Sequence, residues 1–354
     1  MDILYFVLGL VVLIIGAEAL VRGAARLALS LGVSPLVVGL TIVAYGTSAP
    51  EVAVSVDSAL SGKMDLAVGN VVGSNIFNIL FILGISALIA PLLVHRQIIR
   101  QEVPIMIGAM ALMLLFSLDG VIQVYEAGML VLLLIGYTSF LIRQSRAESR
   151  AADGAPEPTS KWDAHWSVQV LLVLAGLGLL VLGSHLLVES ATAIAKAFGV
   201  SDLVIGLTIV AAGTSLPEVA TSITAAVRGQ RDIAVGNVIG SNTFNVFGGL
   251  GISGVASVTG LEVAPSVLGF DIWFMLAVCL ATLPIFVPGG EITRFAGGIL
   301  FFYYFVYTLY LVLGATGSEA LQVYGDVMGS VIGPLTVIIL VFLLVRPKRP
   351  PLPT

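Results

Sequence analysis

The stretch GLTIVAYGTSAPEVAVS, residues 39–55, is almost wholly apolar, yet it carries Gly-Thr-Ser, a proline and a glutamate in close succession. Residues 206–222 read GLTIVAAGTSLPEVATS. An alignment of residues 39–79 with residues 206–246 needs no gap, keeps a constant offset of 167 and gives 27 identical residues in 41 positions. The identical residues include Thr, Ser, Glu, Asp and Asn, so shared apolar composition does not explain the match. The two segments are copies of one repeat.

The composition is that of a membrane protein. Of the 354 residues, 58% are hydrophobic and 10% are charged, whereas a soluble domain is roughly 45–50% apolar and about 25% charged. The net charge of -5 and the absence of a basic patch give no reason to expect a nucleic-acid partner. A membrane span needs about 20 apolar residues. Runs of this kind predict eleven spans, near 2–21, 34–60, 66–93, 99–117, 124–142, 167–188, 202–227, 233–259, 268–288, 293–314 and 327–345.

The basic residues predict the orientation of these spans. With the N-terminus outside, the internal loops and the C-terminal tail contain 14 of the 16 Lys and Arg residues, and only Lys63 and Lys196 lie outside. Cytoplasmic loops carry such an excess of basic residues. We therefore expect a multi-pass protein of the plasma membrane or bacterial inner membrane, with the N-terminus outside and the C-terminus in the cytoplasm.

The order of the spans predicts two inverted repeats. Five spans separate equivalent points of the two copies, and an odd number makes the second copy enter the membrane from the other side. The fold class is therefore an all-α polytopic membrane protein, whose shared polar motifs meet near the midplane. The predicted divisions are a first five-helix repeat (1–142), a cytoplasmic linker (143–166), a second, inverted five-helix repeat (167–314), and an eleventh C-terminal helix with a basic tail (315–354).

The motif GTSAPE (46–51) and its copy GTSLPE (213–218) predict a break in a membrane helix. Pro50 and Pro217 cannot donate a hydrogen bond to the carbonyl four residues back, so each helix should bend or open there. Lipid cannot satisfy a freed carbonyl, so broken backbone at this depth must face protein or a water-filled cavity.

The second motif, GNVVGSNIFN (69–78) with its copy GNVIGSNTFN (236–245), adds hydroxyl and amide groups one helical turn apart. Together the motifs offer only oxygen ligands, which hard cations such as Ca2+ prefer, and no His or Cys for a transition metal. A carboxylate near the bilayer centre is costly unless its charge is balanced. No Lys or Arg lies near Glu51 and Glu218 in their spans, so the balancing charge is a bound cation or a proton.

These motifs resemble the alpha repeats of the cation/calcium antiporter superfamily, in the prokaryotic type of its sodium/calcium exchanger branch, over about ten spans. The resemblance implies a secondary active antiporter that exchanges Na+ for Ca2+ by alternating access, with no enzyme activity and no cofactor besides the transported ions. Carried over by motif, it implies that Glu51 and Glu218 are central ligands. It also implies surrounding side chains of Thr47, Ser48, Ser74, Asn78, Thr214, Ser215, Ser241 and Asn245, and backbone carbonyls near Ala44, Thr47, Ala211 and Thr214.

One position departs from the family pattern, since many relatives have aspartate where this chain has Asn245. The two formal negative charges that remain match one Ca2+, so we expect exchange that does not require K+. A Ca2+/H+ antiporter is the main alternative, and a passive cation channel is a further one. An intramembrane hydrolase is disfavoured, because the sequence has no HExxH motif and no evident nucleophile–base pair.

The remaining polar residues have structural interpretations. Glu18 precedes Arg22 by four residues, which predicts an intrahelical ion pair. Its counterpart in the second repeat, His185, is expected to be a packed, neutral histidine. Asp65 and Asp232 are interpreted as helix N-caps. The glycines of GNVVG and GNVIG predict close helix packing.

Overall fold

The computed structural model describes residues 2–151, 165–199, 209, 211–287 and 290–345. Most of the predicted linker, the first part of the predicted seventh span and the basic tail lie outside these residues. Within them, eight helices are long and apolar enough to cross a membrane, and the bent pair Pro35–Thr47 and Ala49–Leu60 makes a ninth if it is counted as one span. The chain is therefore a helical, multi-pass membrane protein.

The first half contains a long helix, a broken helix and three further spans. In chain order its elements are α1 (Asp2–Leu31), α2 (Pro35–Val38), η1 (Gly39–Val43), α3 (Ala44–Thr47), α4 (Ala49–Leu60), α5 (Met64–Phe77), η2 (Asn78–Leu83), α6 (Gly84–Ile89), β1 (Leu92–Leu93), η3 (Ile98–Glu102), α7 (Val103–Ser117), β2 (Val121–Ile122) and α8 (Val124–Ala151), where η denotes a π-helix.

The second half follows the same order, with one further helical segment at its end. Its elements are α9 (Trp166–Ala197), α11 (Ala211–Gly213), α12 (Leu216–Val227), α13 (Arg231–Phe244), η5 (Asn245–Leu250), α14 (Gly251–Ala256), β3 (Leu261–Glu262), η6 (Val267–Asp271), α15 (Ile272–Phe286), β4 (Glu291–Ile292), α16 (Arg294–Ala315), α17 (Ala320–Val327), η7 (Met328–Ile332) and α18 (Gly333–Val345).

Two short β pairings connect the halves. Strand β1 pairs antiparallel with β4, and β2 pairs antiparallel with β3. The span η3–α7 lies between β1 and β2 in the chain, and its 20 residues correspond to about 30 Å of helix. One β pairing therefore lies at each end of the span. In the order of elements β1 matches β3 and β2 matches β4, so this is the arrangement that two inverted repeats would give.

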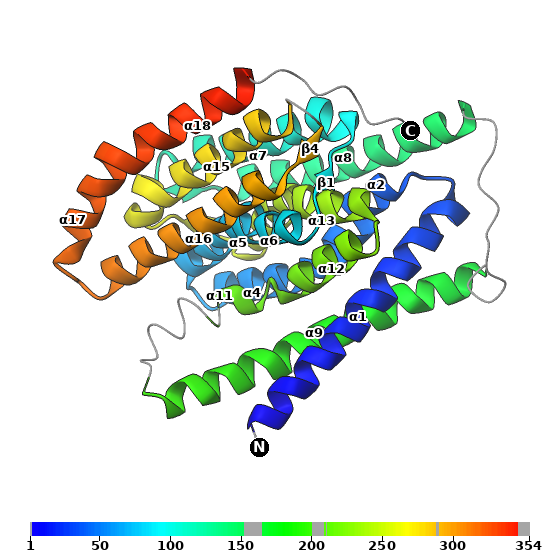
Figure 1. Cartoon of the computed structure of the whole chain (residues 1–354), viewed down its shortest axis with the longest axis horizontal. Helices are drawn as coiled ribbons and strands as arrows, with labels where there is room; N and C mark the ends of the chain where they lie inside the picture. Colours follow the sequence, from blue (N-terminus) through cyan, green and yellow to red (C-terminus); the bar gives the residue numbers. More distant parts are fainter. Residues whose placement is uncertain (1, 152–164, 200–208, 210, 288–289, 346–354) are drawn as a thin grey trace.

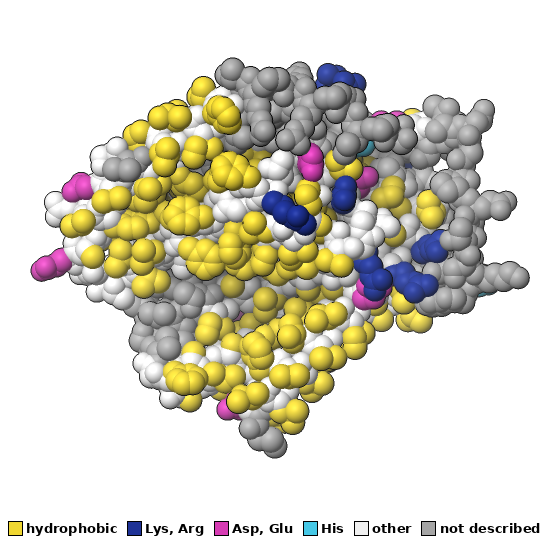
Figure 2. Space-filling model, viewed as in Figure 1, with side chains coloured by type: hydrophobic (Ala, Val, Ile, Leu, Met, Phe, Trp, Pro, Cys, Tyr) yellow, Lys and Arg dark blue, Asp and Glu magenta, His cyan; other side chains and the backbone are white. Residues whose placement is uncertain are grey.

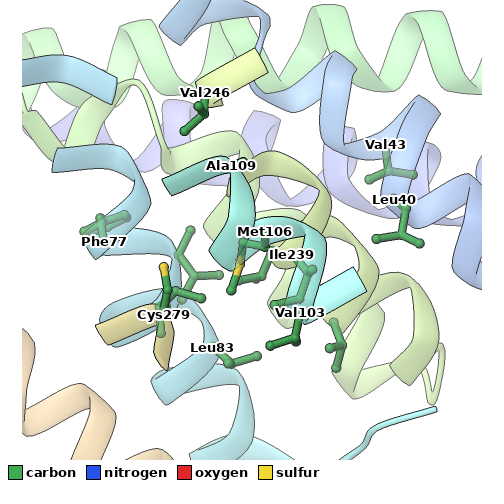
Figure 3. Close-up of a cluster of buried hydrophobic side chains, with 14 of the residues drawn as sticks. Leu40, Val43, Phe77, Leu83, Val103, Met106, Ala109, Ile239, Val246 and Cys279 are labelled. Carbon is green, nitrogen blue, oxygen red and sulfur yellow. The ribbon is translucent and has the colours of Figure 1, made fainter. Parts of the chain in front are cut away.

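The core of the bundle is an apolar cluster drawn from both halves. Figure 3 shows Leu83, Met106, Ile239 and Cys279 together at its centre, and none of these four side chains is exposed. The outer surface is also apolar, and hydrophobic side chains cover much of the face seen in Figure 2. Lipid can cover such a surface, whereas buried polar groups must find partners within the protein.

Helices α1 and α9 form a two-helix unit beside the bundle (Figure 1). They meet along glycines, which let their backbones come close together. A Cβ atom added at Gly176 of α9 would lie 2.6 Å from the backbone nitrogen of Leu20, and one added at Gly183 would lie 2.6 Å from that of Leu13. On the α1 side, a Cβ atom added at Gly9, Gly16 or Gly23 would lie 3.0, 2.8 or 2.9 Å from a backbone nitrogen of α9. No other residue fits in these positions without moving a helix.

Four predicted helix boundaries are wrong, one of them the end of α9, which continues to Ala197 where the span was predicted to end at 188. Helix α1 continues to Leu31, α8 continues to Ala151 through the region predicted to be linker from residue 143, and the last helical segment begins at Ala320. The reason is that apolarity ends at the membrane surface but helix propensity does not. Segments such as GAARLALSL and RQSRAESRA lack Pro and contain mostly helix-favouring residues.

The predicted N-caps at Asp65 and Asp232 are also wrong. The N-cap residues of α5 and α13 are Lys63 and Gln230, and neither makes a side-chain cap hydrogen bond. Asp65 and Asp232 lie in the first turn instead. A negative charge there is favourable because of the helix dipole.

The glycine contact between α1 and α9 predicts the effect of a single methyl group. The variant Gly176→Ala should destabilise the protein by about 1–3 kcal/mol, because overpacking forces the two backbones apart. Gly178→Ala is the matched control on the same helix, since a Cβ there meets no described atom within 4 Å. Thermal unfolding of the purified protein in detergent measures both. Equal melting temperatures for the two variants would contradict the proposed close contact.

Candidate functional site

Both copies of the motif break a helix at the same serine. Helices α3 and α4 meet at Ser48, which has φ −83° and ψ 4°, and the two segments are bent by 45°. In the second half Ser215 has φ −88° and ψ 5° at the start of α12. Pro50 and Pro217 fall in the first turn of the following helix, where the missing N–H of proline is tolerated. The predicted break is confirmed.

The two breaks place each glutamate against the serine of the other repeat. Ser48 Oγ donates to Glu218 Oε1 over 2.8 Å, and Ser215 Oγ donates to Glu51 Oε1 over 2.8 Å. Glu51 is 2% exposed and Glu218 is 1% exposed. In each of them Oε2 is buried and has no hydrogen-bond partner. Neither carboxylate forms an ion pair within the described part of the chain.

The predicted amides Asn78 and Asn245 complete this arrangement. Each is the first residue of a π-helix, η2 or η5, and each is 1% exposed. The π-helix η2 packs against α12, which carries Glu218, and η5 packs against α4, which carries Glu51. The Oδ1 atoms of both amides are buried without a hydrogen-bond partner. Two carboxylate and two amide oxygens are therefore buried without a hydrogen-bond partner on elements that pack together.

The predicted threonines flank the carboxylates, but their contacts differ. Thr47 lies beside Glu218 and Thr214 lies beside Glu51. Thr47 Oγ1 donates to Asn237 Oδ1 over 3.1 Å, whereas Thr214 Oγ1 is buried without a hydrogen-bond partner. The first broken helix is thus bonded to α13, and the second has no equivalent bond to α5 in the described residues.

The remaining predicted residues lie around the same breaks. Ser241 Oγ donates to the carbonyl of Ala44 over 3.5 Å, and that carbonyl also accepts from the Ser48 N–H over 3.0 Å. Ser74 is buried on α5. Ala211 is the first residue of α11. Ser241 therefore meets the Ala44 carbonyl beside the first break, whereas Ser74 and Ala211 lie on α5 and α11, two helices that pack against each other.

One of the carbonyls freed by proline has a partner that the sequence analysis missed. Pro217 cannot bond the carbonyl of Gly213, and Ser184 Oγ of α9 donates to it over 2.6 Å. The residue at the equivalent place in α1 is Ala17, so this bond has no side-chain counterpart in the first repeat. A repeat comparison extended into α1 and α9 would have found this difference.

Four further asparagines, also missed, belong to the same repeats. Asn70 donates to Ser55 Oγ and Asn237 donates to Ser222 Oγ, each over 3.0 Å. Asn75 and Asn242 bond the amides of Asn245 and Asn78. All four are identical between the two copies, which was the signal available in the sequence.

Glu18 of α1 and His185 of α9 have unexpected surroundings. The partner that the structure shows for Glu18 is Arg228 of the second half, at 2.8 Å. His185 is wrongly predicted as packed, since its side chain is 75% exposed and lies 3.7 Å from Glu189. Gly183 faces α1, and His185 is two residues further along the helix, so it points away from that contact.

Close packing by the motif glycines is confirmed for the second copy. A Cβ added at Gly236 would lie 3.0 Å from the Leu36 carbonyl oxygen, and one added at Gly240 would lie 2.5 Å from that of Leu40. Neither Gly69 nor Gly73 has a described atom within 4 Å of such a position, and Leu203 and Leu207, the equivalents of Leu36 and Leu40, lie outside the described residues.

A cavity of about 530 Å³ runs along α4 beside the first break, from Tyr45 to Asp57 and Leu60. Tyr45 and Phe244 stack at its inner end with ring centroids 4.3 Å apart. Asp57, which also lines this cavity, is exposed.

Comparison with known proteins gives a consistent result. Residues 1–143 and 168–313 match the family described as "Sodium/calcium exchanger protein". The chain is 40% identical over 301 residues to CaxA of Alkalimonas amylolytica, covering 82% of this chain and 91% of that protein. It is 32% identical over 346 residues to the sodium/calcium exchanger MaX1 of Methanosarcina acetivorans, covering 88% and 98%. A solved structure of the sodium-calcium exchanger NCX_Mj superposes with a TM-score of 0.75 at 28% identity, covering 88% of this chain and 98% of that one.

The unpartnered carboxylate oxygens predict the behaviour of two amide variants. In Glu51→Gln and Glu218→Gln, Ca2+ should no longer raise the melting temperature, because the charge that balances the cation is removed. Without Ca2+ both variants should be at least as stable as the unmodified protein, since a costly buried charge is gone. Thermal unfolding with and without Ca2+ measures both effects.

Glu148→Gln is the control for this prediction, because Glu148 is an exposed residue at the charged end of α8. It should keep the full response to Ca2+. A normal Ca2+ response in either Glu51→Gln or Glu218→Gln would exclude a site shared by the two glutamates.

Proposed function

The chain belongs to the sodium/calcium exchanger protein family, and we propose that it is a secondary active antiporter that exchanges Na+ for Ca2+ by alternating access. One observation carries this proposal. Two fully buried carboxylates, each held by a serine of the other repeat, keep one oxygen without a partner and have no basic partner within the part of the chain that the structure describes.

The charge of the site supports exchange. With Asn at position 245, Glu51 and Glu218 provide two formal negative charges, which one Ca2+ or two Na+ would balance. Without a bound cation or protons, the site would hold two like charges in an apolar environment, which is expensive. A conformational change that carries the empty site across the membrane is therefore disfavoured, and one ion must leave in exchange for another.

The proposed ligands follow from the same geometry. The central oxygens come from Glu51, Glu218, Asn78 and Asn245. These oxygens are surrounded by hydroxyl side chains and by backbone carbonyls, namely those of Thr47, Ser48, Ser74, Thr214, Ser215 and Ser241 and the carbonyls near Ala44 and Ala211. Oxygen ligands suit both Ca2+ and Na+, since both are hard cations. The two ions would compete for this site, which is what an antiporter requires.

The unequal contacts of the two repeats support alternating access. In the described structure Thr47 bonds Asn237 of α13, while Thr214 does not bond the equivalent Asn70 of α5. We propose that the opposite-facing state exchanges these arrangements, with Thr214 bonded to Asn70 and Thr47 released. The two-helix unit α1–α9 contacts the rest of the protein mainly through α12 and α2, and it is the element we propose to move.

Na+-driven Ca2+ flux tests the proposed function. Purified protein in liposomes should take up radioactive Ca2+ when a Na+ gradient is imposed, with or without K+, and should not respond to a pH gradient alone. Uptake driven only by the pH gradient would identify the alternative, a Ca2+/H+ antiporter. Uptake that needs no counter-ion would identify a channel, and an absolute need for K+ would contradict the charge argument.

We also propose the topology expected from the basic residues. The repeats would comprise 1–142 and 167–314, joined on the cytoplasmic side of the cell membrane, with the N-terminus outside and 315–354 forming the eleventh helix and a cytoplasmic tail. In a Cys279→Ala background, Ser149→Cys should resist an impermeant thiol reagent added to intact cells and react after the cells are opened. Reaction in intact cells would reverse the orientation.

A further inference from the structure

We propose that Asn75 and Asn242 are positioning residues that turn the amide oxygens of Asn78 and Asn245 toward the cation. This inference rests on the proposed function, because it concerns how the proposed ligands are oriented. An asparagine amide has an oxygen that binds a cation and a nitrogen that repels one. A neighbouring group must therefore determine whether the oxygen or the nitrogen of each amide faces the site.

For Asn78, a backbone carbonyl determines the orientation of the amide. Asn242 Nδ2 donates to the carbonyl oxygen of Asn75 over 3.3 Å, and a carbonyl can only accept. The Oδ1 atom of Asn242 must then point the other way, and it accepts from Asn78 Nδ2 over 2.9 Å. Asn78 Oδ1 is left buried without a partner. Asn75 lies three residues before the start of η2, where the hydrogen bonding changes from i→i+4 to i→i+5.

For Asn245, two thioether sulfurs determine the orientation of the amide. Asn75 Nδ2 lies 3.8 Å from Met110 Sδ and 3.7 Å from Met275 Sδ, and a thioether sulfur is a weak acceptor with no hydrogen to donate. Asn75 Oδ1 therefore faces Asn245, whose Nδ2 donates to it over 3.4 Å. Asn245 Oδ1 is likewise left without a partner.

These bonds also connect the two repeats. Asn75 and Asn78 belong to the first repeat, Asn242 and Asn245 belong to the second, and each positioning amide bonds the ligand amide of the opposite repeat. Asn75 and Asn242 are both unexposed, so no water replaces these contacts at the surface. The amide of each ligand is consequently oriented before a cation arrives.

The variant Asn75→Leu removes the acceptor for Asn245 and keeps a similar side-chain volume. Asn245 would then be free to turn its nitrogen toward the cation. Residues that orient metal ligands typically contribute about 10–100-fold to metal affinity, so the Kd for Ca2+, measured by titration calorimetry, and the KM for Ca2+ uptake should rise by that factor. The maximum rate should change much less.

The substitution Asn245→Asp tests whether Asn75 acts by orienting the amide of residue 245 or only by supporting the local structure. Asp presents an accepting oxygen in either orientation, so it needs no positioning residue. In an Asn245→Asp background, Asn75→Leu should therefore lose only a small part of the affinity that it loses in the unmodified protein.

Met110→Leu combined with Met275→Leu should weaken Ca2+ binding without altering any amide. Met113→Leu, another fully buried methionine of α7, is the control and should not weaken it.

The outcomes are distinct. An unchanged Kd in Asn75→Leu, with normal Ca2+ binding by the unmodified protein, would overturn this inference alone. Equal losses in the two backgrounds would overturn it as well, because they would indicate a structural role. If the unmodified protein bound no Ca2+, the proposed function would fail and this inference with it.

Discussion

The structure depends on two reciprocal hydrogen bonds, from Ser48 to Glu218 and from Ser215 to Glu51. Each bond joins the two repeats, and each fixes one carboxylate oxygen while leaving the other free. A carboxylate buried among apolar helices is expensive unless it is paired. Because the described residues offer no basic partner, these glutamates are stable in the membrane only when a cation or a proton is present.

The rest of the fold explains how these groups come together. Each helix breaks at its serine, and the glutamate lies in the first turn of the helix that follows. The proline that precedes the glutamate can begin this helix because an N–H donor is not needed there. The π-helices η2 and η5 start at Asn78 and Asn245, as π segments often do at functional sites. Glycines at the contact of α1 with α9, and of α13 with η1, allow backbones to approach closely.

Much of this arrangement could be predicted from the sequence because the repeat is nearly exact. The GTSAPE and GTSLPE motifs contain the proline that breaks the helix, the carboxylate that needs a counter-charge and the hydroxyls that flank it, so the break followed from simple rules. Helix ends were predicted less well, as at Leu31 and Ala151, because hydropathy marks the membrane and not the helix. The π-helices and the roles of Asn75 and Asn242 could not be predicted, since they depend on which side chain of the other repeat lies opposite. The difference between Thr47 and Thr214 is also invisible in the sequence, because both lie in the same Gly-Thr-Ser triplet of the two motifs.

The central claim is that Glu51 and Glu218 bind one divalent cation together. Anomalous X-ray scattering from crystals grown with Ca2+ would locate the ion directly. The account predicts a single peak at the helix breaks, within the usual Ca2+–oxygen distance of about 2.3–2.6 Å of an oxygen from each glutamate, and its loss when Na+ replaces Ca2+. A peak bound by only one of the two glutamates, or Ca2+ bound elsewhere with the space between them empty, would contradict it.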